Sequence, residues 1–303
     1  MAMNYTEKYA DKIDERFTPT TVSHHATNDD YDFVGAKTIK ITSINVGQNK
    51  DYDRAKGYGE AQQIGNELQE LTMTKDRSFK IVLDKMDEEE TKIKAGEVLA
   101  RQKREVTDPE VEKYRFGKML DVVSASETNK ITGVKGQEYE KFLDAIEVLD
   151  DADVPTVGRV AFVTPTFLKG LKLSDSFIKA SDLGQQILIK GQIGEIDGVP
   201  IVKVNKAWME DNTAETTVKY DCLIAHKSAT VAPIKLAEYK VITDSEDYSG
   251  TVFLGRFYHD CFILNNKKNG LAGIVNPSDA PAVLMAATTG ATKPRTTKKV
   301  AVK

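Results

Sequence analysis

Cysteine is scarce in this sequence. Cys222 and Cys261 are the only two, and two cysteines in a chain of this length do not imply a disulfide framework. Long apolar runs are also missing, so no segment predicts a membrane-spanning helix. Residues 1–8 lack the apolar core of a signal peptide. Together these absences predict a protein that is made and used in a cytoplasm.

An excess of either charge is missing as well. The chain has 42 lysines and arginines against 46 aspartates and glutamates, which gives a formal net charge of -4. No global positive field attracts a nucleic-acid backbone, and this disfavours a general nucleic-acid-binding enzyme. What the chain does have is length and apolar content. Its 303 residues, of which 40% are hydrophobic, suffice for two or three compact units with a real core.

Sequence motifs of catalysis are missing too. Two glycine-containing segments, residues 56–60 and 191–194, lack the Gly-Lys-Ser/Thr ending of a phosphate-binding loop and indicate turns. Ser228, which follows His226 and Lys227, lacks the flanking glycines of a nucleophile elbow. We therefore expect no catalytic residues, no cofactor-binding residues, no cofactor and no enzyme activity.

One group of residues leaves a metal site open. Cys222 lies near His226 in the sequence, and His259 lies near Cys261, so each pair can present both side chains locally to a zinc ion. A zinc-binding enzyme or ligand-binding module is therefore an alternative. Packing is the simpler explanation, because both cysteines lie in apolar strands and cysteine is among the most buried residue types. On this basis we expect no metal ligands.

The strongest structural signal lies in residues 158–205. There an apolar strand leads into Thr164 and Pro165, which suit a helix start because threonine caps free donors and proline needs no partner at that position. The pair Asp197-Gly198, with apolar residues on both sides, predicts a hairpin in which both turn residues need positive φ. The stretch predicts a fold but almost no catalytic chemistry.

Extended patterns dominate the chain before residue 87. Residues 1–33 are polar with scattered single aromatics, which indicates an extended arm. The following span, residues 36–86, predicts an elongated β element with little core of its own. Its β-prone runs are residues 37–43, 68–73 and 79–83, a polar loop lies at residues 48–65, and residues 74–77 separate the last two runs.

Helical patterns follow. Residues 87–106 are highly charged with an apolar stripe, and they carry acids early and bases late, as the helix dipole favours. The pattern restarts at Thr107, a capping residue, and Pro109, which predicts either one interrupted helix or two consecutive helices ending near Ser124. A further amphipathic helix is expected over residues 138–149, after a loop.

The last third of the chain predicts strands and then a tail. The expected strands are residues 218–225, 231–234, 239–243, 250–264 and 271–275. No acidic residue occurs after Asp279, and residues 293–303 form a small basic end.

In their order along the chain, these elements are typical of one known family. The arm, the extended β-loop and the long charged helix precede three local patterns. These are Gly158-Arg159-Val160-Ala161-Phe162-Val163-Thr164-Pro165, Gly194-Glu195-Ile196-Asp197-Gly198-Val199-Pro200-Ile201 and Ile224-Ala225-His226-Lys227-Ser228-Ala229-Thr230-Val231-Ala232-Pro233. Over most of its length the sequence resembles the major capsid proteins of tailed bacteriophages with the Hong Kong 97-type fold.

The resemblance implies an α+β fold of the Hong Kong 97-type phage capsid class, with an N-terminal arm, an extended β-loop, a long spine helix, and peripheral and axial domains. The expected boundaries are 1–35 for the arm, 36–86 for the extended β-loop, 87–125 for the peripheral domain with the spine helix, 126–234 for the axial domain, 235–275 for the second part of the peripheral domain, and 276–303 for the C-terminal tail.

The resemblance also implies a major capsid protein that self-assembles into pentamers and hexamers and forms the icosahedral shell around the phage genome. Its location would be the virion, after assembly in the host bacterial cytoplasm. The implied partners are further copies of the chain, scaffolding, portal and decoration proteins, and packaged double-stranded DNA bound without sequence specificity. No membrane is expected. An encapsulin-like nanocompartment shell protein, which encloses enzyme cargo in the same fold, is the closest alternative.

Two features of that family bear on particular residues. Some relatives join subunits through a covalent lysine–asparagine bond. Lysines occur in the loop region (Lys50, Lys56) and asparagines late in the chain (Asn265, Asn266, Asn269), but they form no isolated matching triplet with a glutamate, and we predict no cross-link. For the basic end, two interpretations stay open. It is either a disordered, solubilising end or a segment that faces packaged DNA.

Overall fold

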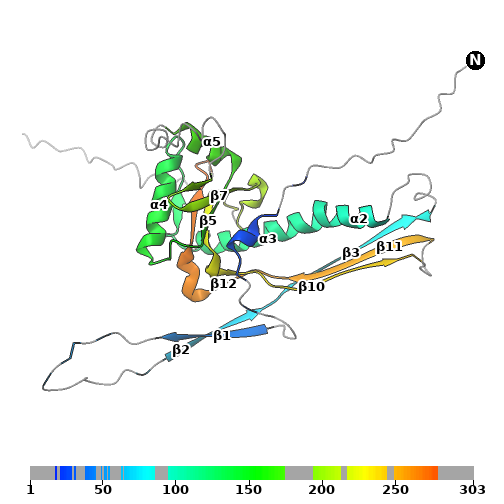
Figure 1. Cartoon of the computed structure of the whole chain (residues 1–303), viewed down its shortest axis with the longest axis horizontal. Coiled ribbons are helices and arrows are strands. Elements are labelled where there is room, and N and C mark those ends of the chain that lie inside the picture. Colours follow the sequence, from blue (N-terminus) through cyan, green and yellow to red (C-terminus); the bar gives the residue numbers. More distant parts are fainter. Residues whose placement is uncertain are drawn as a thin grey trace, which may run out of the picture.

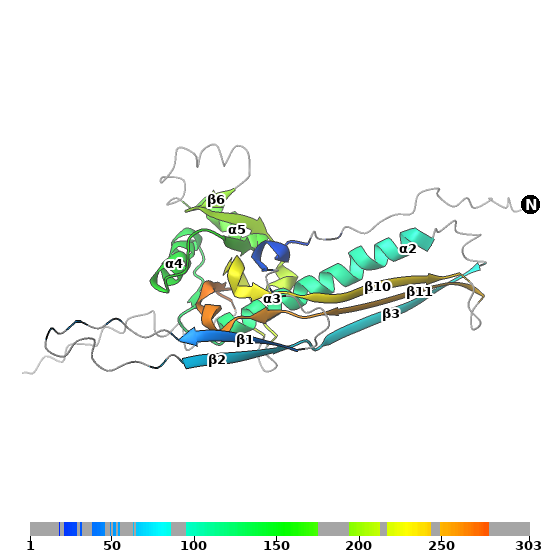
Figure 2. The ribbon, with the colours of Figure 1, turned by 60° about the horizontal axis from the view of Figure 1, so that its bottom comes forward.

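Three substructures make up the part of the chain that the computed structural model describes (Figure 1). A six-stranded sheet has helices on both faces, a long helix runs alongside a three-stranded sheet, and a two-stranded ribbon precedes the three-stranded sheet in the chain (Figures 1 and 2). The described residues are 18, 21–28, 31, 38–45, 49, 51–52, 54, 63, 65–85, 95–174, 194–212, 217–243 and 249–278.

The six-stranded sheet holds the main core. Its strands, in order across the sheet, are β4 (Lys130–Thr132), β13 (Leu271–Val275), β8 (Tyr220–His226), β5 (Arg159–Val163), β7 (Val199–Lys203) and β6 (Glu195–Ile196). Side chains of the central strands alternate between two clusters. Phe162 and Leu223 pack against the long helix, whereas Val163 and Cys222 pack against α4 (Glu138–Asp151) and α5 (Pro165–Leu173). Burial on both faces explains why these strands are continuous apolar runs.

Local signals in residues 158–205 are confirmed where they are described. The Thr164 hydroxyl accepts a hydrogen bond from the Phe167 amide at 3.3 Å, and Pro165 is the first residue of α5. Asp197 and Gly198 have φ values of 50° and 71°, as a turn with two left-handed residues requires. The predicted strand that enters this hairpin is described only as the short β6, since residues 175–193 lie outside the described ranges.

The long helix consists of α2 (Ala95–Gln102), a π-helical turn η2 (Lys103–Thr107) and α3 (Asp108–Ser124). The predicted cap at Thr107 is wrong, because this residue has helical φ and ψ and its side chain caps no amide. Pro109 cannot donate to the carbonyl of Glu105, and the wider π turn before it accommodates that loss without ending the helix. Of the two predicted alternatives, one interrupted helix is observed, and it ends at Ser124. Its expected acidic start at residues 87–90 lies outside the described residues.

The three-stranded sheet joins distant parts of the sequence. Its antiparallel order is β10 (Ile234–Ile242), β11 (Gly250–His259) and β3 (Lys75–Asp84), and β3 pairs with β11 along its full length. An ion pair between Arg77 and Glu110, 2.6 Å long, connects β3 to α3.

Two expectations about the strands of this sheet are corrected. Residues 75–77 belong to β3 rather than to a separating turn, and the strand expected over residues 250–264 is interrupted at Asp260.

The ribbon consists of β1 (Thr38–Asn45) and β2 (Gly65–Thr72), which pair antiparallel from Thr38 opposite Thr72 to Asn45 opposite Gly65. On one face, Ile39 and Ile41 pack against a small cluster that includes the buried side chains of Leu71 and Met73. Most of the predicted loop that joins the two strands lies outside the described residues.

Short elements connect these parts. They are η1 (Ser23–Ala26), η3 (Lys206–Trp208), η4 (Lys227–Ala229), β9 (Thr230–Val231), β12 (Phe262–Ile263) and η5 (Asn265–Gly270).

The expected loop before α4 contains β4, which sequence reasoning missed. On α4 the buried positions are Phe142, Ala145, Ile146 and Leu149, whereas Leu143, which the sequence pattern places on that stripe, is 36% exposed. Within the described ranges, no helix combines the length and apolarity needed to cross a membrane.

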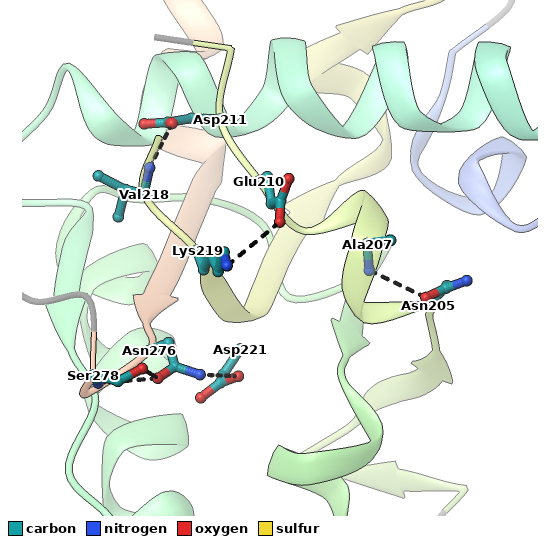
Figure 3. A network of polar contacts seen from close by, with 9 residues as sticks. All are labelled: Asn205, Ala207, Glu210, Asp211, Val218, Lys219, Asp221, Asn276 and Ser278. Carbon is teal, nitrogen blue, oxygen red and sulfur yellow. Dashed lines mark hydrogen bonds and ion pairs between the residues drawn. The ribbon is translucent and has the colours of Figure 1, made fainter. Parts of the chain in front are cut away.

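A hairpin leads the chain from η3 back into β8 (Figure 3). The Tyr220 amide donates to the Met209 carbonyl at 2.9 Å, and the Val218 amide donates to Asp211 Oδ1 at 2.8 Å. These bonds fix the start of β8, which is a central strand of the six-stranded sheet.

Gly255 gives a direct test of the three-stranded sheet. It lies opposite Phe79, and a Cβ atom at Gly255 would come within 2.2 Å of the Phe79 ring. We expect Gly255→Ala to lower the free energy of unfolding by about 1–3 kcal/mol, because the ring must move. Urea denaturation of the unassembled subunit measures this. Gly65→Ala is the control, since a Cβ there meets nothing within 4 Å, and an equal loss in both variants would contradict the prediction.

Candidate assembly surfaces

The arm is held to α3 by a buried carboxylate. Glu112, which is 2% exposed, accepts hydrogen bonds from the amides of Val22 (3.1 Å) and Ser23 (3.0 Å) and from the Ser23 hydroxyl (2.6 Å). Arg115 donates to the same hydroxyl at 2.9 Å. We call Val22, Ser23, Glu112 and Arg115 the arm anchor. It fixes the arm at residues 22–23, while Asn28 donates its amide to the Thr230 carbonyl at 2.8 Å.

A second buried carboxylate holds the point where the ribbon meets the three-stranded sheet. Asp260, which is 2% exposed, accepts hydrogen bonds from the Thr74 amide (2.7 Å), the Thr74 hydroxyl (3.0 Å), the Tyr114 hydroxyl (2.7 Å) and the Cys261 amide (2.8 Å). Burial and then the bond to Asp260 raise the pKa of Tyr114 well above its usual range. We call Thr74, Tyr114 and Asp260 the junction. It sets the direction in which the ribbon leaves the body.

His259 packs against Tyr114 of the junction. It is 3% exposed, its ring stacks on Phe257, and the Tyr114 ring meets it edge-on, with centroid distances of 5.5 Å in both cases. Burial is the main cause that lowers the pKa of His259 below its usual value, and the Arg115 charge adds to the effect. The imidazole is therefore neutral at pH 7, and protonating it in place is unfavourable.

Polar bonds also hold the base of the ribbon. The Gln69 amide group donates to the Ile263 carbonyl at 3.1 Å and its oxygen accepts from the Asn265 amide at 2.9 Å. Asn266 donates to the Ser43 hydroxyl. Two asparagines considered for a cross-link thus lie beside the ribbon of their own chain. Lys50 and Lys56, the lysines considered with them, lie outside the described residues.

The opposite face of the ribbon is exposed and partly apolar. The register places Thr42 opposite Leu68 and Ile44 opposite Asn66, so Ile44 and Leu68 are diagonal neighbours on one face. Ile44 is 67% exposed and Leu68 is 58% exposed. Lys40 and Glu70, which pair on the same face, are also exposed. We call this surface the outer ribbon face.

The zinc alternative receives no support from the positions of its residues. Within the described ranges, no three His, Cys, Asp or Glu side chains are grouped as metal ligands would be. Cys222 packs in the apolar cluster under α4 and α5, and burial raises the pKa of its thiol. Burial likewise raises the pKa of Cys261 to about 12. His226 instead bonds through its two ring nitrogens to the Ser228 hydroxyl (2.8 Å) and the Val157 carbonyl (3.0 Å).

Sequence reasoning did not find Glu112 or Asp260. The partners of each acid are distant in the chain: Ser23 for Glu112 and Thr74 for Asp260. One local signal existed at Asp260, which interrupts a run of β-forming residues at positions 250–264. A single acidic residue in such a run indicates either that the strand ends there or that the carboxylate is buried and hydrogen-bonded to donors elsewhere in the fold.

No protein-family model matches the chain, and no curated protein matches it. Solved structures do. A chain of Mycobacterium phage Che8 aligns with a TM-score of 0.72 at 18% identity, over 91% of this chain and 98% of that chain. The capsid structure of cyanophage P-SCSP1u aligns with a TM-score of 0.72 at 15% identity, over 89% and 92% of the two chains. The mature capsid of bacteriophage PhiM1 gives a TM-score of 0.69 at 11% identity, over 89% and 91%.

These likenesses define a fold class: the chain has the α+β fold of phage capsid chains, which confirms the predicted Hong Kong 97-type fold. The particular structures that it resembles include phage capsids, the class of structure that the sequence predicted. At identities of 11–18% the likeness concerns the fold alone, so function requires a separate argument.

Glu112→Gln tests the arm anchor. The side-chain NH₂ group that this substitution introduces would face donors rather than accept from them, so we expect a loss of about 1–3 kcal/mol in the free energy of unfolding. Proteases should also cut faster within residues 21–28, which limited proteolysis with mass spectrometry detects. Glu147→Gln, on the exposed face of α4, is the matched control. Cleavage of the arm at the wild-type rate would contradict the anchor.

His259 predicts a pH dependence. Its folded pKa lies below the unfolded value of 6.5, so below about pH 6.5 the unfolded state binds a proton that the folded state does not. Stability should therefore fall as the pH drops from 6.5 towards the folded pKa, with a slope of at most about 1.4 kcal/mol per pH unit from this residue. In His259→Phe we expect a flatter slope in urea denaturation. Exposed His24→Asn is the control, and equal slopes in all three proteins would refute the assignment.

Proposed function

We propose that this chain is the major capsid protein of a tailed bacteriophage, a shell-forming protein without enzyme activity. It would assemble into pentamers and hexamers and build an icosahedral shell around the genome. The observation that carries the proposal is the extent of the likeness, since 89% of this chain aligns with 92% of a chain in a cyanophage capsid structure.

The surfaces of the extended elements support assembly. Both strands of the ribbon are edge strands, because β1 and β2 pair only with each other among the described residues. Unpaired strand edges are templates for pairing with another chain, and Ile44 and Leu68 add exposed apolar area beside them. Ordering each residue of such a segment costs about 1–2 kcal/mol. A neighbouring subunit would repay that cost by covering the ribbon.

The three-stranded sheet offers a surface of different chemistry. Arg256 binds both carboxylate oxygens of Asp76, at 3.0 and 2.5 Å, and this bond is the main cause that lowers the pKa of Asp76. On β10, Lys240 pairs with Glu238 at 2.9 Å. All four side chains are exposed, by 41% to 64%. Exposed charges contribute little to the stability of the subunit itself. Complementary charges on a neighbouring subunit would orient the two subunits relative to each other.

The two alternatives are less favoured. An encapsulin-like compartment would have the same fold, but the solved structures named above come from phages, and two of them are named as capsids. A zinc enzyme would require Cys222, His226, His259 and Cys261 to share one site, and the described residues do not group them.

The remaining assignments belong to the same proposal. The virion would be the site of function, after assembly in the host cytoplasm. Packaged DNA, scaffolding, portal and decoration proteins are its proposed partners. The proposed parts keep the predicted boundaries (1–35, 36–86, 87–125, 126–234, 235–275 and 276–303), with two exceptions. β3 contributes to the peripheral sheet through its pairing with β11, and β13 (Leu271–Val275) belongs to the six-stranded sheet of the axial part rather than to the peripheral part.

Electron microscopy of the purified chain tests the proposal. We expect rings, tubes or closed shells in negative stain, from the chain alone or with its scaffold co-expressed. Particles from an infected host should contain nuclease-protected DNA. Particles that enclose an enzyme instead would favour the encapsulin-like alternative, and a strictly monomeric protein with stoichiometric zinc would refute the capsid proposal.

The outer ribbon face gives a residue-level test. The double variant Ile44→Asp and Leu68→Asp should fold as the wild type does, because both side chains are exposed. It should form at least tenfold fewer shells, because burying unpaired carboxylates in a subunit contact costs more than the roughly 1.4 kcal/mol that corresponds to a tenfold change. Sedimentation velocity measures the assembled fraction. Val157→Asp is the control, because Val157 is 86% exposed on a different surface. Assembly of the double variant at the wild-type level would contradict this role.

A further inference from the structure

A cavity of about 640 Å³ lies at one end of the six-stranded sheet, between the loop before α4, the helix α5 and the segment that follows β13. Its volume is within the range of ligand pockets, about 300–1,000 Å³. Part of its wall is apolar. Phe167 and Ile274 form buried surface, and Val134 and Leu173 are 42% and 66% exposed. Two apolar side chains of the lining therefore remain largely or partly uncovered.

The described part of the chain ends at the rim of this cavity. Asn276, Pro277 and Ser278 line it, and Ser278 is the last described residue before the C-terminal 279–303. Polar bonds fix the direction of exit (Figure 3). Asn276 donates to Asp221 Oδ1 at 3.1 Å, and its own oxygen accepts from the Ser278 amide at 3.0 Å. The Gly133 amide also donates to the Val275 carbonyl at 3.0 Å, so the last residues of the described chain are held at the cavity.

The sequence that follows has the matching chemistry. Residues 280–287 are Ala-Pro-Ala-Val-Leu-Met-Ala-Ala and carry no charge, and the first base after Ser278 is Lys293. The cavity lining carries Lys135, Lys141 and Lys169 against the carboxylates of Glu138 and Asp221, and Lys141 also pairs with Asp144 at 2.8 Å. This lining suits a segment whose one charged residue is Asp279 and disfavours the basic residues 293–303. Leu284 is six residues beyond Ser278, and six residues reach up to about 20 Å, which suffices to enter the cavity.

We propose that this cavity is a docking site for the chain's own apolar segment, residues 280–287, with Val283, Leu284 and Met285 as the side chains that fill it. The segment covers Val134 and Leu173 and closes the open end of the sheet. Asp279 meets the lysines of the lining. The basic residues beyond 292 stay outside the cavity. This inference concerns the single subunit and does not depend on the proposed capsid function.

Disulfide trapping tests the docking. The variant Leu173→Cys with Leu284→Cys should form an intramolecular disulfide under mild oxidation, seen as a monomer of altered mobility on a non-reducing gel and as one linked peptide by mass spectrometry. Cys222 and Cys261 give little background, because both are buried and burial raises their thiol pKa values. The same cysteine pair in a chain that also carries Val283→Asp and Met285→Asp is the matched control, since the tether length is unchanged and only the apolar filling is lost.

We expect the cysteine pair to oxidise several-fold faster in the first chain than in the control chain. Equal rates in the two chains would overturn the proposal, as would a ladder of linked dimers and larger species, which would mean that the segment of another copy fills the cavity.

A second measurement needs no engineered cysteine. Leu284→Asp with Met285→Asp should increase the binding of a dye specific for exposed apolar surface, while Thr288→Asp with Thr289→Asp should not. Unchanged dye binding in the first variant would also overturn the docking.

Discussion

The described structure depends on two carboxylates buried beside the long helix, those of Glu112 and Asp260. A buried carboxylate without partners is strongly unfavourable, so each must be met by hydrogen-bond donors. The donors come from segments with little core of their own, Ser23 in the arm and Thr74 where the ribbon joins the sheet. The need to satisfy these two charges thus decides where both extended elements leave the body of the protein.

One turn of α3 serves both carboxylates. Tyr114 donates to Asp260, and Arg115 donates to Ser23 beside Glu112. This turn comes shortly after Pro109 and the π-helical turn η2. The extra residue in η2 changes which side chains of α2 face the three-stranded sheet. On the face of the helix that carries Glu112 and Arg115, the next residues Phe116, Met119 and Leu120 pack against the six-stranded sheet. Apolar packing therefore fixes the helix, and the helix in turn places the polar partners of the arm and the ribbon.

Sequence reasoning predicted the parts that local chemistry determines. Thr164, Pro165 and the Asp197-Gly198 turn act over a few residues, and the structure confirms each. It failed where tertiary contacts override local preference. Thr107 is a good cap in isolation, yet apolar contacts of the residues after it keep the helix continuous. β4 is too short for a periodic pattern and forms because Gly273 and Ile274 offer a strand edge. The partners of Glu112 and Asp260 are set by the fold and lie too far away in sequence for any local pattern.

Two exposed surfaces of the described structure differ in chemistry, so a contact that joined one to the other would be unlike on its two sides. A twofold contact requires one patch that complements itself. The outer ribbon face carries Ile44 and Leu68 beside open strand edges, whereas the exposed face of the three-stranded sheet carries the pairs Asp76–Arg256 and Glu238–Lys240. Neither surface resembles the other, and the ribbon extends away from the sheet that follows it (Figure 2). Contacts that join two different patches repeat head to tail, and they close into a ring when the rotation between neighbours allows it.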